Sequence, residues 1–250
     1  MQCRAKVPNL AVKVQHRIFS VFKYAVALDL RDDNPATTDA LALPKFERTR
    51  KNNRSLPYGQ LAVALESVEV SGALESTKLA IKFVAYTAGR SGEVRGTVWD
   101  EIDIANAVWT IPAERMKMNR THKVPLSAAA MDVLEQAMAL GDGTGLVFPS
   151  AREKELTDNT LSKLLRELDI PSTIHGFRAS FRTWCQKQTN VSHDVAEAAL
   201  AHVTGDKTVA AYARSDLFDK RRSLMAAWAT YLNASESENV VKFGLLPEAS

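Results

Sequence analysis

The feature that most constrains the fold is the stretch I-H-G-F-R-A-S-F-R-T-W in the C-terminal half of the chain. Phe177, Phe181 and Trp184 follow one another at steps of four and three, which predicts a helix with one apolar face. His175 and Arg178 are three residues apart and therefore share a different face of that helix. Such a helix buries its aromatic side chains and still presents an imidazole and a guanidinium to a ligand.

The pair His175 and Arg178 is a candidate anion site, because a planar guanidinium donates to two phosphate oxygens at once. Alone, the H-x-x-R spacing is weak evidence, since a surface histidine beside a solvated arginine fits it as well. Four further residues change this assessment. They lie in the segments T-A-G-R-S-G-E-V-R-G, M-K-M-N-R-T-H-K-V-P-L-S, L-A-H-V-T-G and T-V-A-A-Y-A-R: Arg90, Lys117, His202 and Tyr212.

The order of these six residues resembles the reactive set of the tyrosine recombinases, and most closely that of the integrases of P4-like phages and genomic islands. The runs W-T-I-P-A-E-R-M-K-M, H-G-F-R and Y-A-R-S-D-L-F are similar to that subgroup in particular. The resemblance covers about residues 9–235. One departure is Ala88 in T-A-G-R, where the family usually has glycine. Alanine is also small, so the assignment of Arg90 stands.

The resemblance implies that the protein cuts DNA by a covalent route. Tyr212 would attack the scissile phosphate, form a 3′-phosphotyrosyl link and free a 5′-hydroxyl, since tyrosine is a workable nucleophile once its proton is removed. Arg90 and Arg178 would hold the non-bridging oxygens, where phosphoryl transfer needs its charge stabilised. The reverse reaction with another strand rejoins DNA without ATP or a metal ion.

The same resemblance implies supporting roles for other residues. Lys117 would protonate the leaving 5′ oxygen, His175 would assist proton transfer at the nucleophile, and His202 would donate a hydrogen bond to the phosphate. Glu93 is better placed to orient an arginine than to react. His122, which precedes V-P-L, is expected to have a structural or DNA-contact role.

The expected fold is mostly α (α+β), a helical tyrosine recombinase catalytic domain with a small three-stranded antiparallel sheet. The sequence supports this sheet from Val98 onward, where the apolar period changes. V-W-D-E-I-D-I-A-N-A-V-W-T-I-P predicts a hairpin with Ala105 and Asn106 near its turn. K-V-P-L after His122 predicts a third strand, so Lys117 falls in the connection between the second and third strands.

Helices are predicted before and after this sheet. Ser127 and Thr157 are typical N-cap residues, and Gly89 ends the helix before Arg90. The predicted helices cover residues 58–70, 74–88 and 127–140, the run L-S-K-L-L-R-E-L, the stretch from Ile174, and residues 216–233.

The N-terminal part carries one amphipathic helix over residues 8–30, and a single helix does not bury its apolar stripe alone. It looks like the last helix of the small bundle that forms the family's core-binding domain. We therefore expect a chain truncated at its N-terminus. The stripe consists of Leu10, Val14, Ile18, Val21, Ala25 and Leu28.

Three segments are expected. Residues 1–56 are the C-terminal part of a core-binding (SAM-like) domain with a basic linker, residues 57–235 the integrase catalytic domain, and residues 236–250 a tail. The run V-V-K-F-G-L-L in this tail either adds as a strand to a sheet edge or stays disordered. Basic residues of the linker are expected to lie along a phosphate backbone: Arg48, Arg50, Lys51 and Arg54.

The distribution of charge fits a nucleic-acid partner. The net charge of the 250-residue chain is only +3, but residues 1–56 hold 11 Lys and Arg against 5 Asp and Glu. This asymmetry fits DNA contacted mainly by one segment, and a solvated basic linker fits it equally well. We expect double-stranded DNA attachment sites as the partner, a tetramer on synapsed DNA, a monomer when free, and an accessory excision factor.

Other classes of protein are not indicated. No apolar run is long enough to span a bilayer, and no signal peptide is evident. Cys3 and Cys185 suggest neither a disulfide framework nor a zinc site. The sequence has no GxxxxGK loop and no carboxylate cluster suited to magnesium. We therefore expect a cytoplasmic, nucleoid-associated bacterial protein that uses no metal and no cofactor.

Three functions remain open on this evidence. The first is a site-specific recombinase for integration or excision of a prophage or genomic island. The second is a truncated, non-catalytic DNA-binding remnant of an integrase, which the short N-terminal part favours. The third is a type IB topoisomerase, which shares the reactive set, but the phage-like motifs argue against it. A nicked suicide substrate would separate an enzyme from a binding protein.

Overall fold

The structure is a computed structural model that describes residues 7–37, 39–40, 55–141, 143, 145–202 and 214–234. The chain divides into two compact units, Met1–Asn52 and Asn53–Ser250. Some of the residues singled out in the sequence lie outside the described part: Arg48, Arg50, Lys51, Arg54, Tyr212 and the tail from residue 235.

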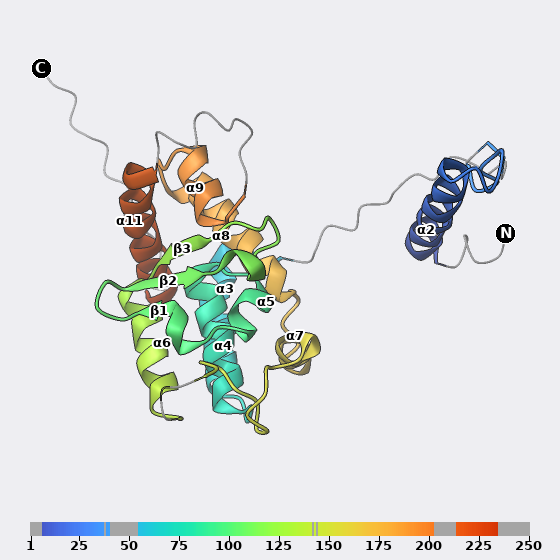
Figure 1. Cartoon of the computed structure of the whole chain (residues 1–250). Coiled ribbons are helices and arrows are strands. Elements are labelled where there is room, and N and C mark those ends of the chain that lie inside the picture. Colours follow the sequence, from blue (N-terminus) through green and yellow to red (C-terminus); the bar gives the residue numbers. More distant parts are fainter. Residues whose placement is uncertain are drawn as a thin grey trace, which may run out of the picture. The chain divides into compact units, whose positions relative to one another are not determined.

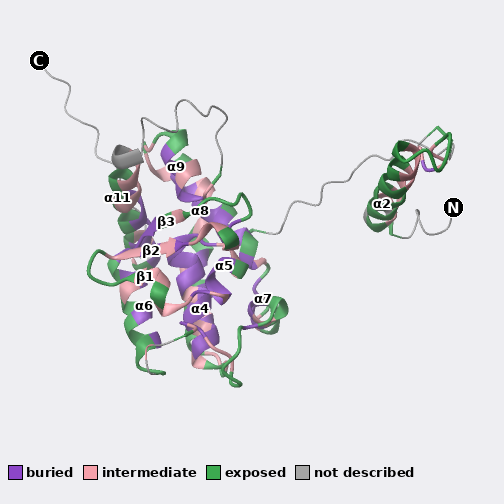
Figure 2. Cartoon of the chain, in the orientation of Figure 1, coloured by how far each residue is buried: buried purple, intermediate pink, exposed green. Residues whose placement is uncertain are grey.

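The first unit contains the expected amphipathic helix, α2 (Pro8–Ala27). Pro8 stands in its first turn, where a missing N–H group costs nothing. Asn34 Nδ2 donates to Phe19 O at 3.0 Å, so the turn after the helix folds back against it. The apolar stripe stays largely open to solvent, as Figure 2 shows by the exposed colour along α2. Its exposed members are Leu10, Val14, Ile18, Val21 and Leu28.

The second unit is built around α4 (Glu75–Thr87), which lies in its centre and is buried along most of its length (Figures 1 and 2). Leu79, Phe83 and Val84 of this helix are fully buried. The helix packs against elements from before and after the sheet. These neighbours are α3 (Leu61–Glu69), α5 (Ser91–Arg95), α6 (Ala128–Met138), α7 (Asp158–Glu167), α8 (Ile174–Gln188) and α11 (Arg214–Asn233).

The sheet has three antiparallel strands in the order β1 (Ile102–Asp103), β2 (Val108–Ile111) and β3 (His122–Pro125). Trp109 pairs with Val124, and Ile111 pairs with His122. The expected three-stranded antiparallel sheet is therefore confirmed.

The expected start of the hairpin at Val98 is wrong. Val98 forms an isolated bridge with Leu146, and Trp99–Glu101 is a short 3₁₀ helix. The Glu101 carboxylate turns inward and accepts a hydrogen bond from Trp109 Nε1 at 3.0 Å. This contact favours a tight turn over an extended strand, so β1 begins only at Ile102.

The helix predicted from Ile174 is α8, and its start is capped as a helix start requires. Thr173 Oγ1 accepts from the Gly176 N–H at 3.0 Å. Phe181 and Trp184 are buried and contact Trp228 of α11 at ring-centroid distances of 5.5 and 5.0 Å. The aromatic face thus fixes α8 against α11, and the opposite face remains free for the candidate site. Within the described residues, no helix is long and apolar enough to cross a membrane.

Candidate active site

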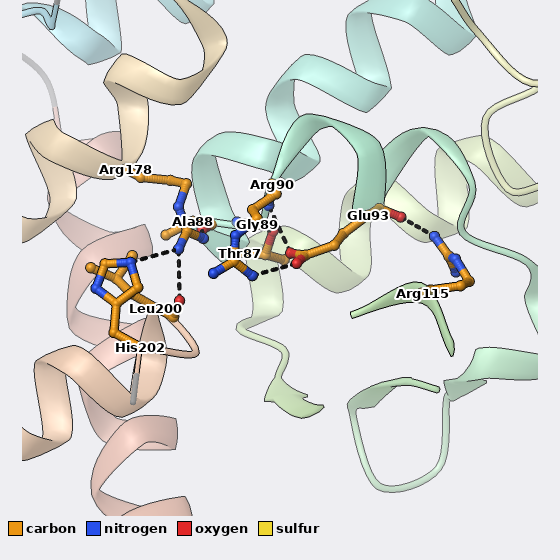
Figure 3. A network of polar contacts seen from close by, with 9 residues as sticks. All are labelled: Thr87, Ala88, Gly89, Arg90, Glu93, Arg115, Arg178, Leu200 and His202. Atoms are coloured by element: carbon orange, nitrogen blue, oxygen red, sulfur yellow. Dashed lines mark hydrogen bonds and ion pairs between the residues drawn. The ribbon is translucent and has the colours of Figure 1, made fainter. Parts of the chain in front are cut away.

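Arg178 lies at the centre of the candidate site, and its side chain is held by backbone groups. Arg178 is 4% exposed. Its guanidinium donates to Ala88 O through Nη1 and to Leu200 O through Nη2 at 2.7 Å. Nη2 also lies 3.4 Å from His202 Nε2. Figure 3 shows these groups around Arg178. The carbonyls come from the ends of two different helices, so the fold aims the guanidinium before any ligand arrives.

One of these carbonyls depends on the left-handed backbone at Ala88. Ala88 is the C-cap of α4 with φ 49°, and it is 1% exposed. This conformation costs an L-residue about 1–2 kcal/mol, whereas glycine adopts it freely. Ala88 stands where the family usually has glycine, and its backbone conformation is one that favours glycine. The left-handed turn is nevertheless formed with alanine. A Cβ on Gly89 would come within 3.1 Å of Val94 and of Thr87 Oγ1, a tight fit that favours glycine at that position.

Arg90 is oriented by Glu93, as expected. Arg90 is the N-cap of α5, and its backbone N–H donates to Glu93 Oε2 at 2.9 Å. Its Nη1 donates to Glu93 Oε1 at 2.5 Å. Glu93 itself is only 6% exposed. A carboxylate that contacts both the main chain and the side chain of Arg90 sets the direction of that guanidinium.

The two guanidinium groups lie close enough to repel each other. Burial first, and then the charge of Arg90, lower the pKa of Arg178 to about 10, although Glu93 and Glu197 offset part of this. Figure 3 shows the Arg90 and Arg178 side chains next to each other, with Glu93 on one side and His202 on the other. Like charges held together in a buried setting are stabilised when an anion binds between them.

A second buried arginine shows what a structural guanidinium looks like in this protein. Arg95 is 8% exposed and forms ion pairs with two carboxylates, Glu155 and Asp158. Arg178, by contrast, has only carbonyl and imidazole partners among the described residues. Buried charges are normally paired. The charge of Arg178 is therefore available to an anion from outside the protein.

The two predicted histidines lie beside Arg178. His202 Nδ1 is 2.7 Å from Glu197 Oε2, and its Nε2 faces Arg178. His175 is exposed. Desolvation by neighbouring atoms, followed by the charges of Arg178, Arg90 and His202, holds the pKa of His175 below its ordinary value. A lowered pKa favours the unprotonated imidazole, the form that accepts a proton, and the role expected for His175 stays a prediction.

No contact among the described residues links Lys117 to this cluster. It is exposed in the connection between β2 and β3, and no described residue forms a hydrogen bond or ion pair with it. The base of the connection is fixed by Arg115, which donates to Glu101 and to the backbone oxygen of Glu93. The connection is fixed at Arg115, and the Lys117 side chain has no partner among the described residues. That side chain can therefore move toward a ligand.

His122, for which a structural or DNA-contact role is expected, feels the charges of Arg90, Arg178 and Glu93. Burial first, and then the charge of Arg221, lower the pKa of His122 to about 4, and Arg90 and Arg178 add to the effect. Glu93 acts in the opposite direction. The imidazole is therefore neutral at pH 7, beside three arginines.

His122 should make the fold less stable as the pH falls. The unfolded chain binds a proton near pH 6.5, but the folded chain does so only near pH 4. Stability therefore rises with pH across this window, and the His122 contribution between pH 7 and 5 is about 2 kcal/mol. Urea unfolding at both pH values, compared between the native protein and His122→Gln, measures it. His16→Gln, which alters an exposed histidine on α2, is the control. An unchanged pH dependence in His122→Gln would contradict the expectation.

An open cavity of about 1200 Å³ borders His122, between the sheet and α11. Three basic side chains of its wall carry positive charge, which suits a polyanion. The residues that line it are Asp103, Asn106, Val108, Thr110, Ala113, Asn119, Arg120, Thr121, His122, Lys123, Phe218 and Arg221.

The helix that follows the predicted nucleophile is fixed by contacts that the sequence did not indicate. α11 begins at Arg214, two residues after Tyr212. Arg221 Nη1 donates to Lys123 O at 2.9 Å, and Arg222 Nη2 donates to Asn106 O at 3.1 Å. These bonds hold α11 against β3 and the hairpin turn. They go to backbone oxygens far away in the chain, so no local spacing signals them.

The chain is similar in sequence to known integrases. The profile of the phage integrase family matches residues 59–217. Prophage integrase IntA of Escherichia coli (strain K12) is 33% identical over 229 residues, which cover 90% of this chain and 55% of that protein. The integrase of Enterobacteria phage P4 is 31% identical over 251 residues, covering 93% of this chain and 57% of that protein. The chain thus spans a little over half the length of these relatives.

Solved structures share the fold. A lambda integrase dimer bound to a COC′ core site superposes with a TM-score of 0.57 and 18% identity, covering 81% of this chain and 58% of that one. The Tn1549 transposon integrase in complex with circular intermediate DNA superposes with a TM-score of 0.59 and 16% identity, covering 85% of this chain and 77% of that one. At these identities the likeness shows the architecture alone.

Proposed function

Because the chain belongs to the phage integrase family, we propose that it is a tyrosine-type site-specific recombinase that cuts and rejoins DNA strands. It would serve the integration or excision of a prophage or genomic island. The observation that carries this proposal is the pair Arg90 and Arg178, in which Arg178 is buried, prealigned and without a carboxylate partner among the described residues. A phosphodiester is an anion that such a pair binds through two oxygens.

In the proposed reaction one bond to phosphorus forms as another breaks. The Tyr212 oxygen attacks the scissile phosphate and loses its proton, and the bond from phosphorus to the 5′ oxygen breaks. Arg90 and Arg178 stabilise the charge on the non-bridging oxygens. The product is a 3′-phosphotyrosyl link and a free 5′-hydroxyl. Attack by a 5′-hydroxyl of another strand reverses the step, without ATP or a metal ion.

The remaining residues would handle protons around the phosphate. Lys117 gives a proton to the leaving 5′ oxygen, and its exposed, unpaired state is compatible with movement toward DNA. His175, with its lowered pKa, assists removal of the tyrosine proton. His202, when both of its ring nitrogens carry a proton, donates to a phosphate oxygen through Nε2, the nitrogen that faces Arg178.

The proposed partner is double-stranded DNA that carries attachment sites. One related structure is described as a lambda integrase tetramer bound to a Holliday junction. By this analogy we propose a tetramer on synapsed DNA. We also propose that the free protein is a monomer, that an accessory excision factor is a partner, and that the protein acts at the nucleoid in the cytoplasm. His122, at the edge of the basic cavity, is proposed to contact DNA. So is the linker cluster, which lies outside the described residues: Arg48, Arg50, Lys51 and Arg54.

The proposal also assigns three segments of the chain to domains. Residues 1–56 would be the end of a core-binding domain with its linker, residues 57–235 the catalytic domain, and residues 236–250 a tail. The stripe on α2 supports the first assignment, since it is exposed among the described residues of its unit. The tail lies outside the described residues.

A nicked suicide substrate tests the proposal against a non-catalytic DNA-binding remnant. In this DNA the short segment beyond the scissile phosphate diffuses away after cleavage, so rejoining is prevented and the covalent product accumulates. A recombinase should give a protein band linked to labelled DNA on a denaturing gel. Binding in a mobility-shift assay without any such band would favour the remnant.

Replacement of Lys117 by alanine should slow cleavage of ordinary DNA by about 10²–10⁴-fold, the usual contribution of a general acid. Substituting sulfur for the leaving 5′ oxygen should restore the rate, because a thiolate leaves without a proton. The control is Lys163→Ala, which removes an exposed lysine from α7, a helix that does not line the basic cavity. Single-turnover rates on both substrates measure the effect. Equal defects of Lys117→Ala on oxygen and sulfur substrates would remove Lys117 from this role.

A further inference from the structure

Glu197 contacts His202, and the proposed reaction gives this glutamate no role. It lies on α9 (His193–Ala199), and its side chain is 13% exposed. Its Oε2 is 2.7 Å from His202 Nδ1, and its Oε1 accepts from Arg182 Nε of α8. Arg182 Nη2 in turn lies 3.0 Å from His193 Nδ1. The carboxylate therefore joins the reactive histidine to the helix that carries Arg178.

The carboxylate of Glu197 is ionised. Burial by itself raises its pKa, but hydrogen bonds from His202 and Arg182, together with the charges of these residues, outweigh burial and lower the pKa below its ordinary value. An ionised carboxylate only accepts hydrogen bonds. The short contact to His202 therefore needs a proton on Nδ1, and that bond sets which tautomer the ring adopts.

This tautomer determines what His202 offers to a ligand. With the proton on Nδ1, the other nitrogen, Nε2, points toward Arg178 Nη2 at 3.4 Å. The His202 side chain is 45% exposed, so the ring lies partly open to a ligand. When the ring carries a second proton on Nε2, the nearby carboxylate stabilises its positive charge.

We infer that Glu197 is a positioning residue that holds His202 with Nδ1 protonated and Nε2 directed at the phosphate site. Arg182 in turn holds Glu197. This inference rests on the proposed DNA cleavage for its functional consequence, but the ring geometry itself does not. The charged and titratable groups that face His202 from the described elements are Glu197 on α9 and Arg178 and His175 on α8.

A purely structural role is the competing explanation, because the Arg182–Glu197 ion pair also ties α8 to α9. The two roles differ in one respect. A structural bond acts whatever residue stands at position 202, whereas a positioning bond has nothing to act on once His202 is gone. A double-mutant cycle separates them.

The kinetic test measures covalent cleavage of the nicked substrate in single turnover by the native protein, Glu197→Gln, His202→Ala and the double variant. Glu197→Gln should cleave about 10–100-fold more slowly, as is typical when the partner that orients a histidine is lost. In the His202→Ala background the same change should have no further effect. Glu167→Gln on α7, which alters an exposed ion pair with Lys163, should cleave at the native rate. Equal slowing by Glu197→Gln in both backgrounds would overturn the inference.

The second test does not depend on cleavage. Nitrogen-15 NMR of the histidine rings in the DNA-free protein reports the tautomer directly, with His202→Ala identifying the resonance. We expect the Nδ1-protonated form in the native protein and a loss of that preference in Glu197→Gln. A native His202 protonated on Nε2 and not on Nδ1 would overturn the inference. If the native protein formed no adduct with DNA, the proposed function would fail, and the tautomer would still decide the positioning of His202.

Discussion

Replacing Tyr212 by phenylalanine should abolish the covalent DNA adduct, with a fall in its rate of formation of at least about 10⁴-fold, as when other covalent nucleophiles are removed. The substitution deletes one oxygen, the atom that the proposed reaction joins to phosphorus. Helix α11, which begins two residues later, is held by Arg221 and Arg222, so the fold and DNA binding should persist. A nicked substrate labelled on the cleaved strand, run on a denaturing gel, measures the adduct.

The matched control is Tyr86, which sits in the core on α4. Its hydroxyl donates to Asn233 Oδ1 at 2.6 Å, and burial raises its pKa, which disfavours the phenolate. Tyr86→Phe should cleave at the native rate and lose about 1 kcal/mol of stability with its hydrogen bond. An adduct that persisted in Tyr212→Phe would exclude Tyr212 as the nucleophile.

Helix α8 shows how far local periodicity carries a prediction. Phe177, Phe181 and Trp184 predicted an apolar face, and all three are buried. The three-residue spacing of His175 and Arg178 also placed them correctly on the other face, yet Arg178 is buried and His175 is exposed. Periodicity gives the face of a helix. The depth of a side chain on that face depends on neighbours such as Ala88 and Leu200, which are distant in sequence.

The first strand shows where the same reasoning fails. The β-branched and aromatic residues from Val98 onward have strand propensity, but strand propensity is readily overridden by packing. Here the Glu101 carboxylate accepts from Trp109 and Arg115, and Val98 pairs with Leu146. These contacts span 8 to 48 residues of chain, and only the folded structure reveals them.

The residues of the candidate site also fall into two groups, those that the sequence predicted and those that only the structure shows. The reactive residue types and their order were readable from the sequence, and the structure brings Arg90, His175, Arg178 and His202 together. The residues that orient them were only partly readable. Glu93 was found because it is three residues from Arg90. Glu197 was missed although it is only five residues from His202, because α9 ends between them and no helical spacing signals their contact.

Replacing Arg178 by lysine should slow cleavage by about 10²–10³-fold, the usual loss when one prealigned charge-stabilising contact is removed. Lysine keeps the positive charge, so the affinity for DNA should change little. It lacks the planar fork that donates to Ala88 O and Leu200 O together, so its charge is not held in one direction. The rate of adduct formation in single turnover, measured at saturating protein, separates this defect from weaker binding.

Arg95→Lys is the control that decides how the Arg178 result is interpreted. Both arginines are buried and both contact several groups, so each lysine variant should lose stability, by about 1–3 kcal/mol for each buried partner left unsatisfied. Arg95 forms ion pairs with Glu155 and Asp158. The guanidinium of Arg178 contacts no carboxylate among the described residues. Only Arg178→Lys should therefore lose cleavage. If both variants cleaved equally slowly, the loss would follow from weakened folding, and Arg178 would have no special part in stabilising the phosphate.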